Sequence, residues 1–587
     1  MNKKYIGERY VPKLDGEWDN TKAYEPLTIV TFNGSSFTSR NHVPIGININ
    51  NINYWVETGN LSIGLNTYKI INVLNLGCDN KGLMDCSKLL KNITNCTLFF
   101  PSGIYRFDNK IDLQNVNVIG NNATLELHYE NSPNILPILS FKDTSKAIIS
   151  GLTFISDGFG IKTSYSENIE IKNCHFETKS YSIYFWGSET KPCYNISVHD
   201  CTFNNNSVDV PNKSDGVHFN GYCDTLYLYN LSGFTGDDFI ALNACEGEDT
   251  NGYIKNVFIH DCVTRYKGNN CFSSVRIYGT HENTFENINI IDCYFYSQQS
   301  AITISNASKV TYEPTNPNIS IDKINIINCN IELEQCKPNY SILTSIAFFV
   351  SGSTIKNMKI DNIKVLFKNT GDVENKKLIV TNCCDIDVLN ISNIFDFNGN
   401  SIIMLERVNA TKPTTINKLF CRNIEFNGTS SDQLIRTING GTCDNLFIEK
   451  CIINASTIFN IDTTSAIHNA YIDDNVVNCS YAVVNNNIID FIKMSNNVLN
   501  LDNGCIYDKR TKSILTVLFN NNIVKKFVLS FRVNDNTDIS DVRLNGDCIT
   551  TLSIVKGIIG DSHYFVKENK IYSKKIYDGS EFKEIVL

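Results

Sequence analysis

Two short segments of the sequence carry acidic residues beside a glycine, one after the other in the chain. Residues 213–220 read Lys-Ser-Asp-Gly-Val-His-Phe-Asn, and residues 235–243 read Thr-Gly-Asp-Asp-Phe-Ile-Ala-Leu-Asn. Asp237 follows Asp215 by 22 residues. If one repeat forms one turn of a coil, this spacing brings Asp215, Asp237 and Asp238 onto one face. Carboxyl groups held close together repel one another, which raises the pKa of at least one and lets an acid and a base coexist.

The expected geometry follows from the spacing of β-strands. Aligning the two segments places Asp215 beside Asp237 and Gly216 beside Asp238. Adjacent strands lie ~4.8 Å apart, so the three carboxylates are expected within about 5 to 8 Å of one another. Carboxyl groups about 6.5–9.5 Å apart suit an inverting glycosidase. The alternative is turn chemistry, which Asp-Gly usually indicates, but two acidic clusters in register favour function.

Four further residues near these segments are candidates for substrate binding: His218, Glu246, Arg276 and Tyr278. His218 stands between two apolar residues expected to point inward, so it should face outward near the carboxylates and assist them. An arginine such as Arg276 binds a carboxylate or phosphate well, although a solvated arginine fits equally. Glu246 is expected on a loop, either lining a groove or simply hydrated. His260 is expected on another strand of its rung, in solvent.

A repeated phrase predicts the fold. Residues 168–176, Asn-Ile-Glu-Ile-Lys-Asn-Cys-His-Phe, recur at 195–203 and then, with variations, to about residue 525 at steps of 22 to 36 residues. Within each copy apolar residues alternate, which is a strand pattern, and Asn or Asp makes a turn. A period of 20 to 50 residues is typical of a solenoid, and the leucine-rich consensus is absent. We therefore predict an all-β fold whose main part, residues 66–530, is a right-handed parallel β-helix of about a dozen rungs.

The cysteines support this interpretation. The chain has 21 cysteines, an odd number. Six stand at the same place in the phrase: Cys174, Cys201, Cys262, Cys293, Cys329 and Cys451. We interpret them as small buried residues stacked in a ladder. The alternative, a disulfide framework, belongs to small secreted domains. No Cys-x-x-Cys pair or Cys/His cluster has zinc spacing, so no metal site is predicted.

The two ends of the chain differ from the repeats. Residues 1–65 are expected to form a small β domain, with a hairpin in which Asn33-Gly34 joins residues 28–32 to 35–38. Apolar residues at 84, 89, 90 and 93 fit one stripe of a short helix. Residues 531–587 are expected to form a cap or a trimerisation tail, with a hairpin around Asp578-Gly579.

Composition excludes some classes of partner. The net charge is −9 and no long Lys/Arg run occurs, so nucleic acid is not an expected partner. No apolar run has the length of a signal peptide core or a membrane span, so we expect no membrane partner. The protein is expected to be made in the cytoplasm and to stay soluble, reaching a cell exterior only by another route.

Four phrases near the N-terminus resemble a known module. They are Gly-Glu-Arg-Tyr-Val-Pro at 7–12, Leu-Asp-Gly-Glu-Trp at 14–18, Tyr-Glu-Pro-Leu-Thr-Ile-Val at 24–30 and Tyr-Trp-Val-Glu-Thr-Gly at 54–59. They look like the N-terminal module of phage tailspike and pre-neck appendage proteins from viruses of Gram-positive bacteria. In that family the module attaches the protein to the virion. The resemblance implies location on a virion tail, contact with other virion proteins and a homotrimer.

Two further resemblances concern the coil. Leu-Phe-Phe-Pro-Ser-Gly-Ile-Tyr at 98–105, after the expected helix, is similar to the start of pectate-lyase-like β-helices, where the helix covers the open end. The acidic segments and Val-Arg-Ile at 275–277 resemble the polygalacturonase pattern of Asn-Thr-Asp-Gly, Gly-Asp-Asp and Arg-Ile-Lys. That family implies Asp237 as the general acid, Asp215 and Asp238 as the groups that activate water, and Arg276 as the holder of an acidic substrate group.

The chain departs from the polygalacturonase pattern in two places. The Gly-His-Gly rung is missing, and Tyr278 stands where the lysine would be. Residues 214–243 are closer to the appendage proteins of small podoviruses, which cleave cell-wall teichoic acids. The resemblance therefore implies a phage tail depolymerase that hydrolyses a host surface polysaccharide or teichoic acid and requires no cofactor. A divalent metal would fit if the target is a phosphodiester. The alternatives are a teichoic-acid phosphodiesterase at the same site and a glycan-binding adhesin without activity.

Overall fold

The computed structural model shows two compact units, one formed by Met1–Ile71 with Asn95–Thr97 and one by the rest of the chain. The structure describes residues 13–32, 35–60, 69–128, 136–205, 214–245, 251–265, 273–280, 282–297, 300–306, 319–334, 346–368, 376–406, 412–508, 515–524, 529–531, 539–545, 548–549, 558–559, 562–567, 570–575 and 583–585.

The first unit contains a four-stranded sheet. Its strands are β1 (Lys13–Glu17), β2 (Thr28–Phe32), β3 (Ser35–Ser39) and β4 (Trp55–Asn60). Val30 and Trp55 lie in its small apolar core. β2 and β3 pair in antiparallel fashion with Phe32 opposite Ser35, so the predicted hairpin pairing is confirmed. The two connecting residues, Asn33 and Gly34, lie outside the described residues.

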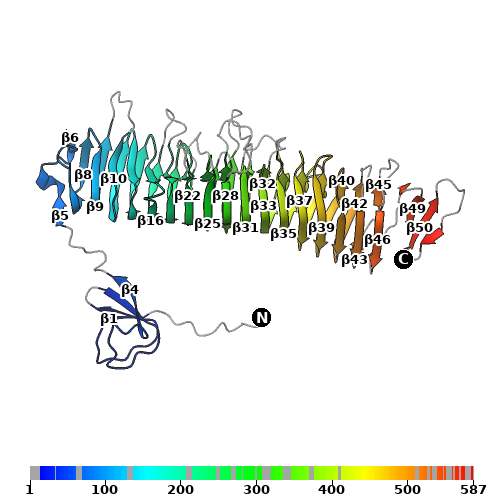
Figure 1. The fold of residues 1–587 in the computed structure, drawn as a ribbon, viewed down its shortest axis with the longest axis horizontal. Helices are drawn as coiled ribbons and strands as arrows, with labels where there is room; N and C mark the ends of the chain where they lie inside the picture. The colour runs from blue at the N-terminus through cyan, green and yellow to red at the C-terminus, as the bar shows by residue number, and fades with distance from the viewer. Residues whose placement is uncertain are drawn as a thin grey trace. The chain divides into compact units, whose positions relative to one another are not determined.

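The second unit is a parallel β-helix, in which the chain coils so that strands of successive rungs pair (Figure 1). Three walls of parallel strands run along it. The first wall contains β10 (Pro137–Lys142), β12 (Phe159–Ser164), β15 (Ile183–Gly187), β18 (Val217–Gly221), β21 (Ile240–Asn243), β24 (Val275–Tyr278), β27 (Ile302–Ser305), β30 (Ile346–Ser351), β32 (Lys377–Asn382), β34 (Ser401–Leu405), β36 (Gln433–Thr437) and β45 (Leu529–Phe531).

The second wall contains β13 (Glu167–Lys172), β16 (Cys193–His199), β19 (Cys223–Tyr229), β22 (Tyr253–His260), β25 (Asn283–Ile291), β28 (Ile319–Ile327), β37 (Thr442–Glu449), β39 (Ala466–Asp473), β41 (Phe491–Ser495), β43 (Leu515–Asn520) and β46 (Ile539–Asn545). The third contains β6 (Lys81–Asp85), β8 (Gly103–Phe107), β14 (His175–Thr178), β17 (Thr202–Asn204), β20 (Ser232–Phe234), β23 (Val263–Thr264), β26 (Tyr294–Ser297), β29 (Asn330–Glu334), β44 (Ile523–Val524) and β47 (Cys548–Ile549).

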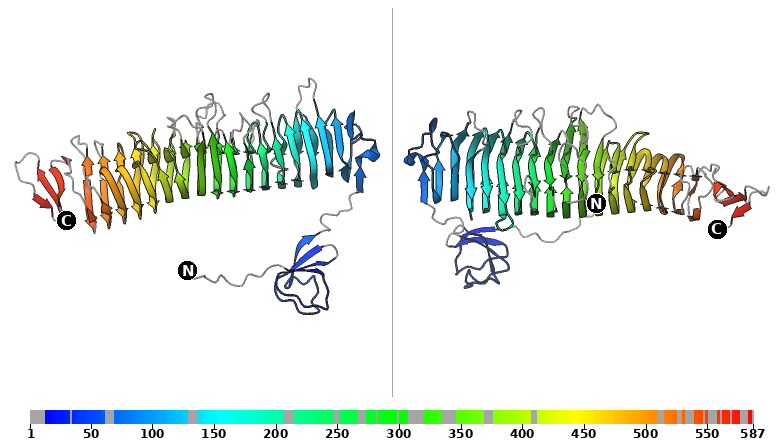
Figure 2. Two further views of the ribbon diagram at one scale, coloured as in Figure 1. Left: turned by 180° about the vertical axis from the view of Figure 1, so that it is seen from behind. Right: turned by 45° about the horizontal axis from the view of Figure 1, so that its top comes forward.

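Some long strands turn corners and serve two walls or, in the case of the first, all three. They are β9 (Ile111–Leu127), β11 (Ala147–Ser156), β31 (Ser353–Lys368), β33 (Asp385–Phe397), β35 (Thr415–Asn427), β38 (Ile452–Ile461), β40 (Val476–Asn485) and β42 (Val498–Asp508). At the start of the coil, β5 (Lys69–Asn72) pairs with β7 (Thr94–Phe100). Figure 2 shows the same stack of strands from two further sides. The predicted fold class, an all-β parallel β-helix, is confirmed.

The interior of the coil is built by the alternation seen in the sequence. Val217, Ile240 and Val275 occupy one row of the first wall, and each is 0% exposed. In the next inward row, the rings of Phe185 and Phe219 stack at 4.8 Å. Successive inward side chains therefore form continuous columns, whose burial stabilises the coil because each apolar side chain leaves water.

The cysteines lie in these columns. All 18 cysteines that the structure describes with their side chains are free and buried, including the six of the repeated phrase. The interpretation as a ladder of buried thiols is confirmed, and among the described residues the disulfide framework is excluded.

Asn and Asp build the corner between the second and third walls in most of the described rungs. Six corner residues have φ between 50° and 56°: Asn173, Asp200, Asn230, Asp261, Asp292 and Asn328. These residues tolerate the left-handed conformation because their short polar side chains bond locally. Their repeated place in the sequence phrase thus marks the turn of the chain from the second wall to the third.

The predicted helix at residues 84–93 is wrong. β6 ends at Asp85, β7 begins at Thr94, and the residues between them form turns. The Asp85 carboxylate accepts hydrogen bonds from the backbone N–H and the hydroxyl of Ser87, which favours a turn. Asn92 has a φ of 62°, which no α-helix accommodates. Over the described residues the one helix is the short 3₁₀ segment η1 (Val73–Leu76).

The C-terminal strands β48 (Ile558–Ile559), β49 (Ser562–Lys567), β50 (Lys570–Lys575) and β51 (Lys583–Ile585) form a separate sheet. β50 and β51 pair in antiparallel fashion, with Ile571 opposite Ile585. The predicted turn at Asp578-Gly579 lies outside the described residues. In the part of the chain that the structure describes, no helix has the length and apolar character needed to cross a membrane.

Candidate active site

Three consecutive strands of the first wall, β18, β21 and β24, position the candidate site. Val217 pairs with Ile240, and Ile240 pairs with Val275, all pointing inward. Because side chains alternate along a strand, the next residues of the three strands form one row on the outer face.

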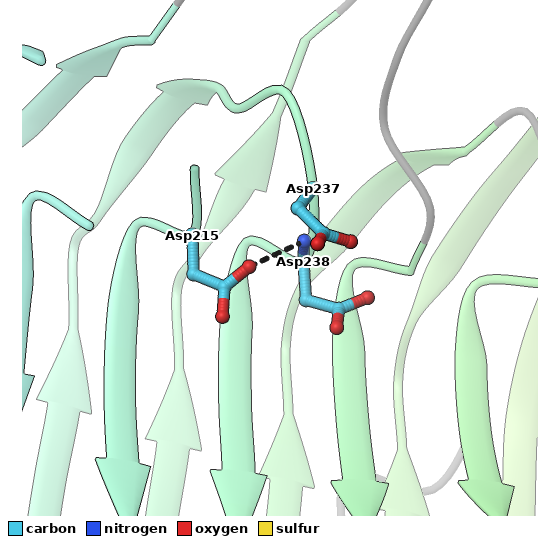
Figure 3. Close-up of side chains that lie close together, drawn as sticks. All are labelled: Asp215, Asp237 and Asp238. Carbon is cyan, nitrogen blue, oxygen red and sulfur yellow. Dashed lines mark hydrogen bonds between the residues drawn. The ribbon is translucent and has the colours of Figure 1, made fainter. Parts of the chain in front are cut away.

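The three predicted carboxylates come together at the start of these strands. One oxygen from each of Asp215, Asp237 and Asp238 lies within 4.8 Å of the other two. The backbone N–H of Asp238 donates a hydrogen bond to Oδ1 of Asp215 at 3.0 Å, as Figure 3 shows. Each aspartate is no more than 3% exposed. Burying charges this close together costs free energy unless the charges are paired, so such a cluster is usually kept for a reaction or for binding.

The predicted register between the two acidic segments is wrong by one residue. Since Val217 pairs with Ile240, and the Gly216 N–H donates to the carbonyl of Asp238, Asp215 lies opposite Asp238. Asp237 precedes Asp238 in a bend, which the Thr235 hydroxyl holds by donating a hydrogen bond to the Asp237 carbonyl at 2.9 Å. The bend brings the Asp237 carboxylate to the same side as its neighbours (Figure 3).

Neighbouring groups anchor two of the carboxylates. Nδ1 of His218 lies 2.7 Å from Oδ2 of Asp215, and His218 is 1% exposed. The backbone N–H of Ser273 donates to Oδ1 of Asp238 at 3.2 Å. A guanidinium nitrogen of Arg276 lies 3.6 Å from Oδ2 of the same carboxylate. His218 therefore holds Asp215 within its own rung, and two residues of the next rung hold Asp238.

Among the described residues, the three aspartates lie beside the guanidinium of Arg276, which is 6% exposed, and the imidazole of His218. Like charges this close disfavour one another's ionised forms. The site is therefore suited either to holding a proton for transfer or to binding a divalent ion. Oxygens within 4.8 Å of one another fit around one such ion, whose bonds to oxygen are about 2.0–2.6 Å long.

The structure brings most of the predicted site residues together. His218 faces outward as expected and contacts Asp215. The Arg276 guanidinium lies over the Tyr278 ring at 4.5 Å, so Tyr278 supports the arginine. Glu246 lies outside the described residues. His260 belongs to β22 on the second wall, where its Nδ1 lies 2.8 Å from an oxygen of Asp261.

Sequence reasoning missed the aromatic residues beside the cluster. Tyr184 pairs with His218 across β15 and β18, and their rings stack at 4.9 Å. The signal was present, because Ile-Tyr-Phe-Trp-Gly at 183–187 repeats the in-out alternation of Val-His-Phe-Asn-Gly at 217–221. Tyr184 and Trp186 occupy the outward positions of that pattern.

The chain is similar in structure to several solved proteins. No protein-family model and no curated protein matches the chain. Similar structures include Geobacillus virus E2 ORF18, at 13% identity over 71% of this chain and 75% of that one, with a TM-score of 0.29. They include a Yersinia enterocolitica family 28 exopolygalacturonase, at 10% identity, 90% and 83% coverage and a TM-score of 0.32. PfbA, a Streptococcus pneumoniae surface adhesin, is similar at 11% identity, 88% and 99% coverage and a TM-score of 0.30. Similarity at this level carries no argument about activity.

Proposed function

We propose that the chain is a hydrolase that cleaves a glycosidic bond in a host cell-surface glycopolymer. The observation that carries this proposal is the group of three buried carboxylates within 4.8 Å of one another on adjacent rungs. A general acid and a general base placed together are what hydrolysis of a glycosidic bond requires. The anchoring of Asp215 and Asp238 by neighbouring donors supports the proposal, because a catalytic carboxylate must be held in one orientation.

The roles follow from the arrangement and from the polygalacturonase resemblance. Asp237 protonates the leaving oxygen of the glycosidic bond. Asp215 and Asp238, joined through the backbone N–H of Asp238, hold one water molecule, and one of the two carboxylates accepts its proton as the water oxygen attacks the anomeric carbon. No carboxylate then remains to act as nucleophile, so the product has inverted configuration. His218 orients Asp215, and Arg276 holds Asp238 and an acidic group of the substrate.

One distance bears on this stereochemistry. The closest carboxylate oxygens, within 4.8 Å, are nearer than the about 6.5–9.5 Å usual between acid and base in inverting enzymes. Bound substrate must therefore separate Asp237 from the other two carboxylates to admit the bond and the water. The anomer released first, observed by proton NMR during hydrolysis, tests the assignment. A retained anomer would overturn the inverting mechanism and leave the hydrolase proposal intact.

We further propose that the protein acts as a homotrimeric appendage of a phage tail at the host surface. The support is the likeness of four phrases between residues 7 and 59 to virion-attachment modules. The decisive experiment incubates the full chain with purified host wall polymers and analyses the products. Shortened chains with new reducing sugar ends are expected. Polymer that binds but stays intact would overturn the hydrolase and favour the adhesin.

A teichoic-acid phosphodiesterase is the second candidate. It is favoured by the fit of the carboxylate cluster to a divalent ion and by Arg276, which suits a phosphate. Asp215, Asp237 and Asp238 would hold the ion, which would supply an activated water. In the same incubation, this activity would release glycerol phosphate or ribitol phosphate in place of reducing sugar.

A further inference from the structure

An aromatic surface adjoins the carboxylate cluster on the two preceding strands of the first wall, β12 and β15. The Tyr184 ring stacks on His218, and the Tyr181 ring lies 4.7 Å from the same imidazole. Phe159 packs against both tyrosines, at 5.0 and 5.7 Å. Phe159, Tyr181 and Tyr184 are partly exposed, whereas His218 is buried. Lys162 of β12 and Trp186 of β15 stand on the same two strands. We call Lys162, Tyr184 and Trp186 the aromatic platform.

Lys162 places a positive charge close to both rings of the aromatic platform. Its Nζ lies 5.4 Å from the ring centre of Tyr184 and 5.5 Å from that of Trp186. Lys162 also pairs with Tyr184 across β12 and β15, so it stands in the outward row that leads to His218. The side chain is partly exposed.

The outward row differs on the two sides of the carboxylates. Before them it runs through Lys162 and Tyr184, which are partly exposed. After them it runs from Arg276 to Thr303 and Phe349, which are 2% and 0% exposed. A polymer that crosses the carboxylates along this row therefore meets an accessible aromatic surface on the side of β12 and β15.

Two cations of the row are placed at equal steps from His218. Lys162 lies two strands before it, and Arg276 lies two strands after it, so each is about 10 Å away at ~4.8 Å per strand. An anionic polymer would otherwise be repelled by the three aspartates and by the net charge of −9. Cations on both sides offset this repulsion.

We infer that the aromatic platform binds an uncleaved repeat unit of an anionic glycopolymer. A sugar ring packs its C–H face against Tyr184 and Trp186, and a phosphate or carboxylate of the repeat unit lies at Lys162. Partly exposed aromatic rings supply apolar contact area at low entropic cost, and an ammonium supplies a point charge for an anion. This inference rests on the proposed function only for where the cleaved bond lies. The inference itself is about binding of a repeat unit that is not cleaved.

Binding is measured with the full chain carrying Asp237→Asn and Asp238→Asn, so that the polymer stays intact. The probes are a polyuronate, a poly(glycerol phosphate) teichoic acid and neutral dextran, titrated by calorimetry. We expect one of the two polyanions to bind at least about tenfold more tightly than dextran. Adding Trp186→Ala should weaken that binding about tenfold, and adding Lys162→Gln about threefold to tenfold, less at high salt.

Matched variants on another wall serve as controls. Lys255 lies over the Tyr253 ring at 4.6 Å on β22, and Tyr471 stacks on Phe447 at 4.9 Å. Lys255→Gln and Tyr471→Ala therefore remove the same chemistry away from the carboxylates. Both should bind the polymer as the parent does. A melting curve for each variant excludes loss of fold.

The outcomes separate this inference from the proposed function. If Trp186→Ala and Lys162→Gln bind like the parent while the wild type shortens the polymer, the binding inference is contradicted and the hydrolase proposal is unaffected. If both variants lose binding and the wild type shortens nothing, the binding inference is supported and the hydrolase proposal is contradicted. Equal affinity for dextran and the polyanions, or no binding to any probe, overturns the inference. The better polyanion tells whether Lys162 meets a carboxylate or a phosphate.

Discussion

The backbone N–H of Asp238 and the carboxylate of Asp215 are joined by a hydrogen bond of 3.0 Å between adjacent rungs (Figure 3). This bond makes the pairing of β18 with β21 part of the site itself. The coil thereby holds one carboxylate against the chain that carries the other two. The predictions that follow test this arrangement and the fold that supports it.

Replacing each carboxylate of the cluster should abolish most activity. Asp215→Asn, Asp237→Asn and Asp238→Asn each remove an acid or base while keeping the size of the side chain. General acid–base groups contribute about 10²–10⁴-fold, so kcat on the cognate polymer should fall by that factor. Reducing-end assays on purified polymer give the rates.

Asp261→Asn is the matched control for these variants. Asp261 is exposed at a corner with a φ of 53°, where the equivalent residues Asn230 and Asn328 already show that asparagine fits. Its activity should equal that of the wild type. Polymer degradation that continues unchanged in all three cluster variants would remove the catalytic assignment.

His218 should act as a positioning residue for Asp215. His218→Ala removes a hydrogen bond to a carboxylate, typically about 1.5–3 kcal/mol, so kcat should fall about 10-fold to 100-fold. His218→Asn places an amide N–H near the position of Nδ1 and should restore part of the rate. Equal loss in both variants, with unchanged melting temperature, would argue that the imidazole does more than orient Asp215.

Chelation should separate the two candidate reactions. A glycosidic hydrolysis by carboxylates alone proceeds at an unchanged rate in excess EDTA. A phosphodiesterase that uses an ion held by Asp215, Asp237 and Asp238 loses activity and regains it with added divalent metal. We expect the first result. Restoration by metal, together with released glycerol or ribitol phosphate, would establish the second candidate instead.

A ladder of buried asparagines should be important for stability. Asn497 is 1% exposed and donates from Nδ2 to the carbonyl of Ile472 and to Oδ1 of Asn522, both at 2.9 Å. Asn497→Ala leaves these groups without their partner, so the free energy of unfolding should fall by about 2–4 kcal/mol. Urea unfolding measures the change.

The control for the ladder is Asn500→Ala. Asn500 is exposed, and its Nδ2 donates to Oδ1 of Asn478 at 2.9 Å. Because water replaces this bond, the change should stay within about 0.5 kcal/mol. A similar loss for both variants would mean that burial does not decide the contribution of these ladders.

Alkaline pH should destabilise the coil through its buried thiols. Burial raises the pKa of the Cys443 thiol from its ordinary 9.0 to about 12. Below pH 9 the thiol is protonated in both states. Between about pH 9 and 12 only the unfolded chain ionises, so it binds fewer protons and stability falls by up to about 1.4 kcal/mol per pH unit for this thiol. Melting temperatures from pH 8 to 10.5 should decline, and less steeply in Cys443→Ala.

The alternation of residues in the sequence was enough to predict which side chains of the first wall face outward. Val217 and Phe219 are buried inside, so His218 lies outside, as the period of two requires. The exact register was not predictable by matching acidic residues, because the connections between strands differ in length from rung to rung. Only the pairing of the following strands shows that Asp215 lies opposite Asp238.

The error at residues 84–93 has a similar cause. Spacing predicted one apolar stripe, but Met84 is 58% exposed while Leu90 is 0% exposed. The local bonds of Asp85 to Ser87 compete with helical hydrogen bonds, and sequence periodicity does not weigh that competition. The aromatic platform was missed for another reason, since Tyr184 and Trp186 carry no acidic signature and their position matters only beside His218.

The left-handed Asn and Asp corners have a consequence for how this chain can change in length. Each corner closes its rung with the same local turn, so a rung is a unit that can be duplicated or deleted without altering its neighbours' turns. The carboxylates and the aromatic platform occupy only the stretch from β12 to β24. Whole rungs beyond that stretch can therefore be gained or lost by recombination, which adjusts the reach of the protein while its chemistry is inherited intact.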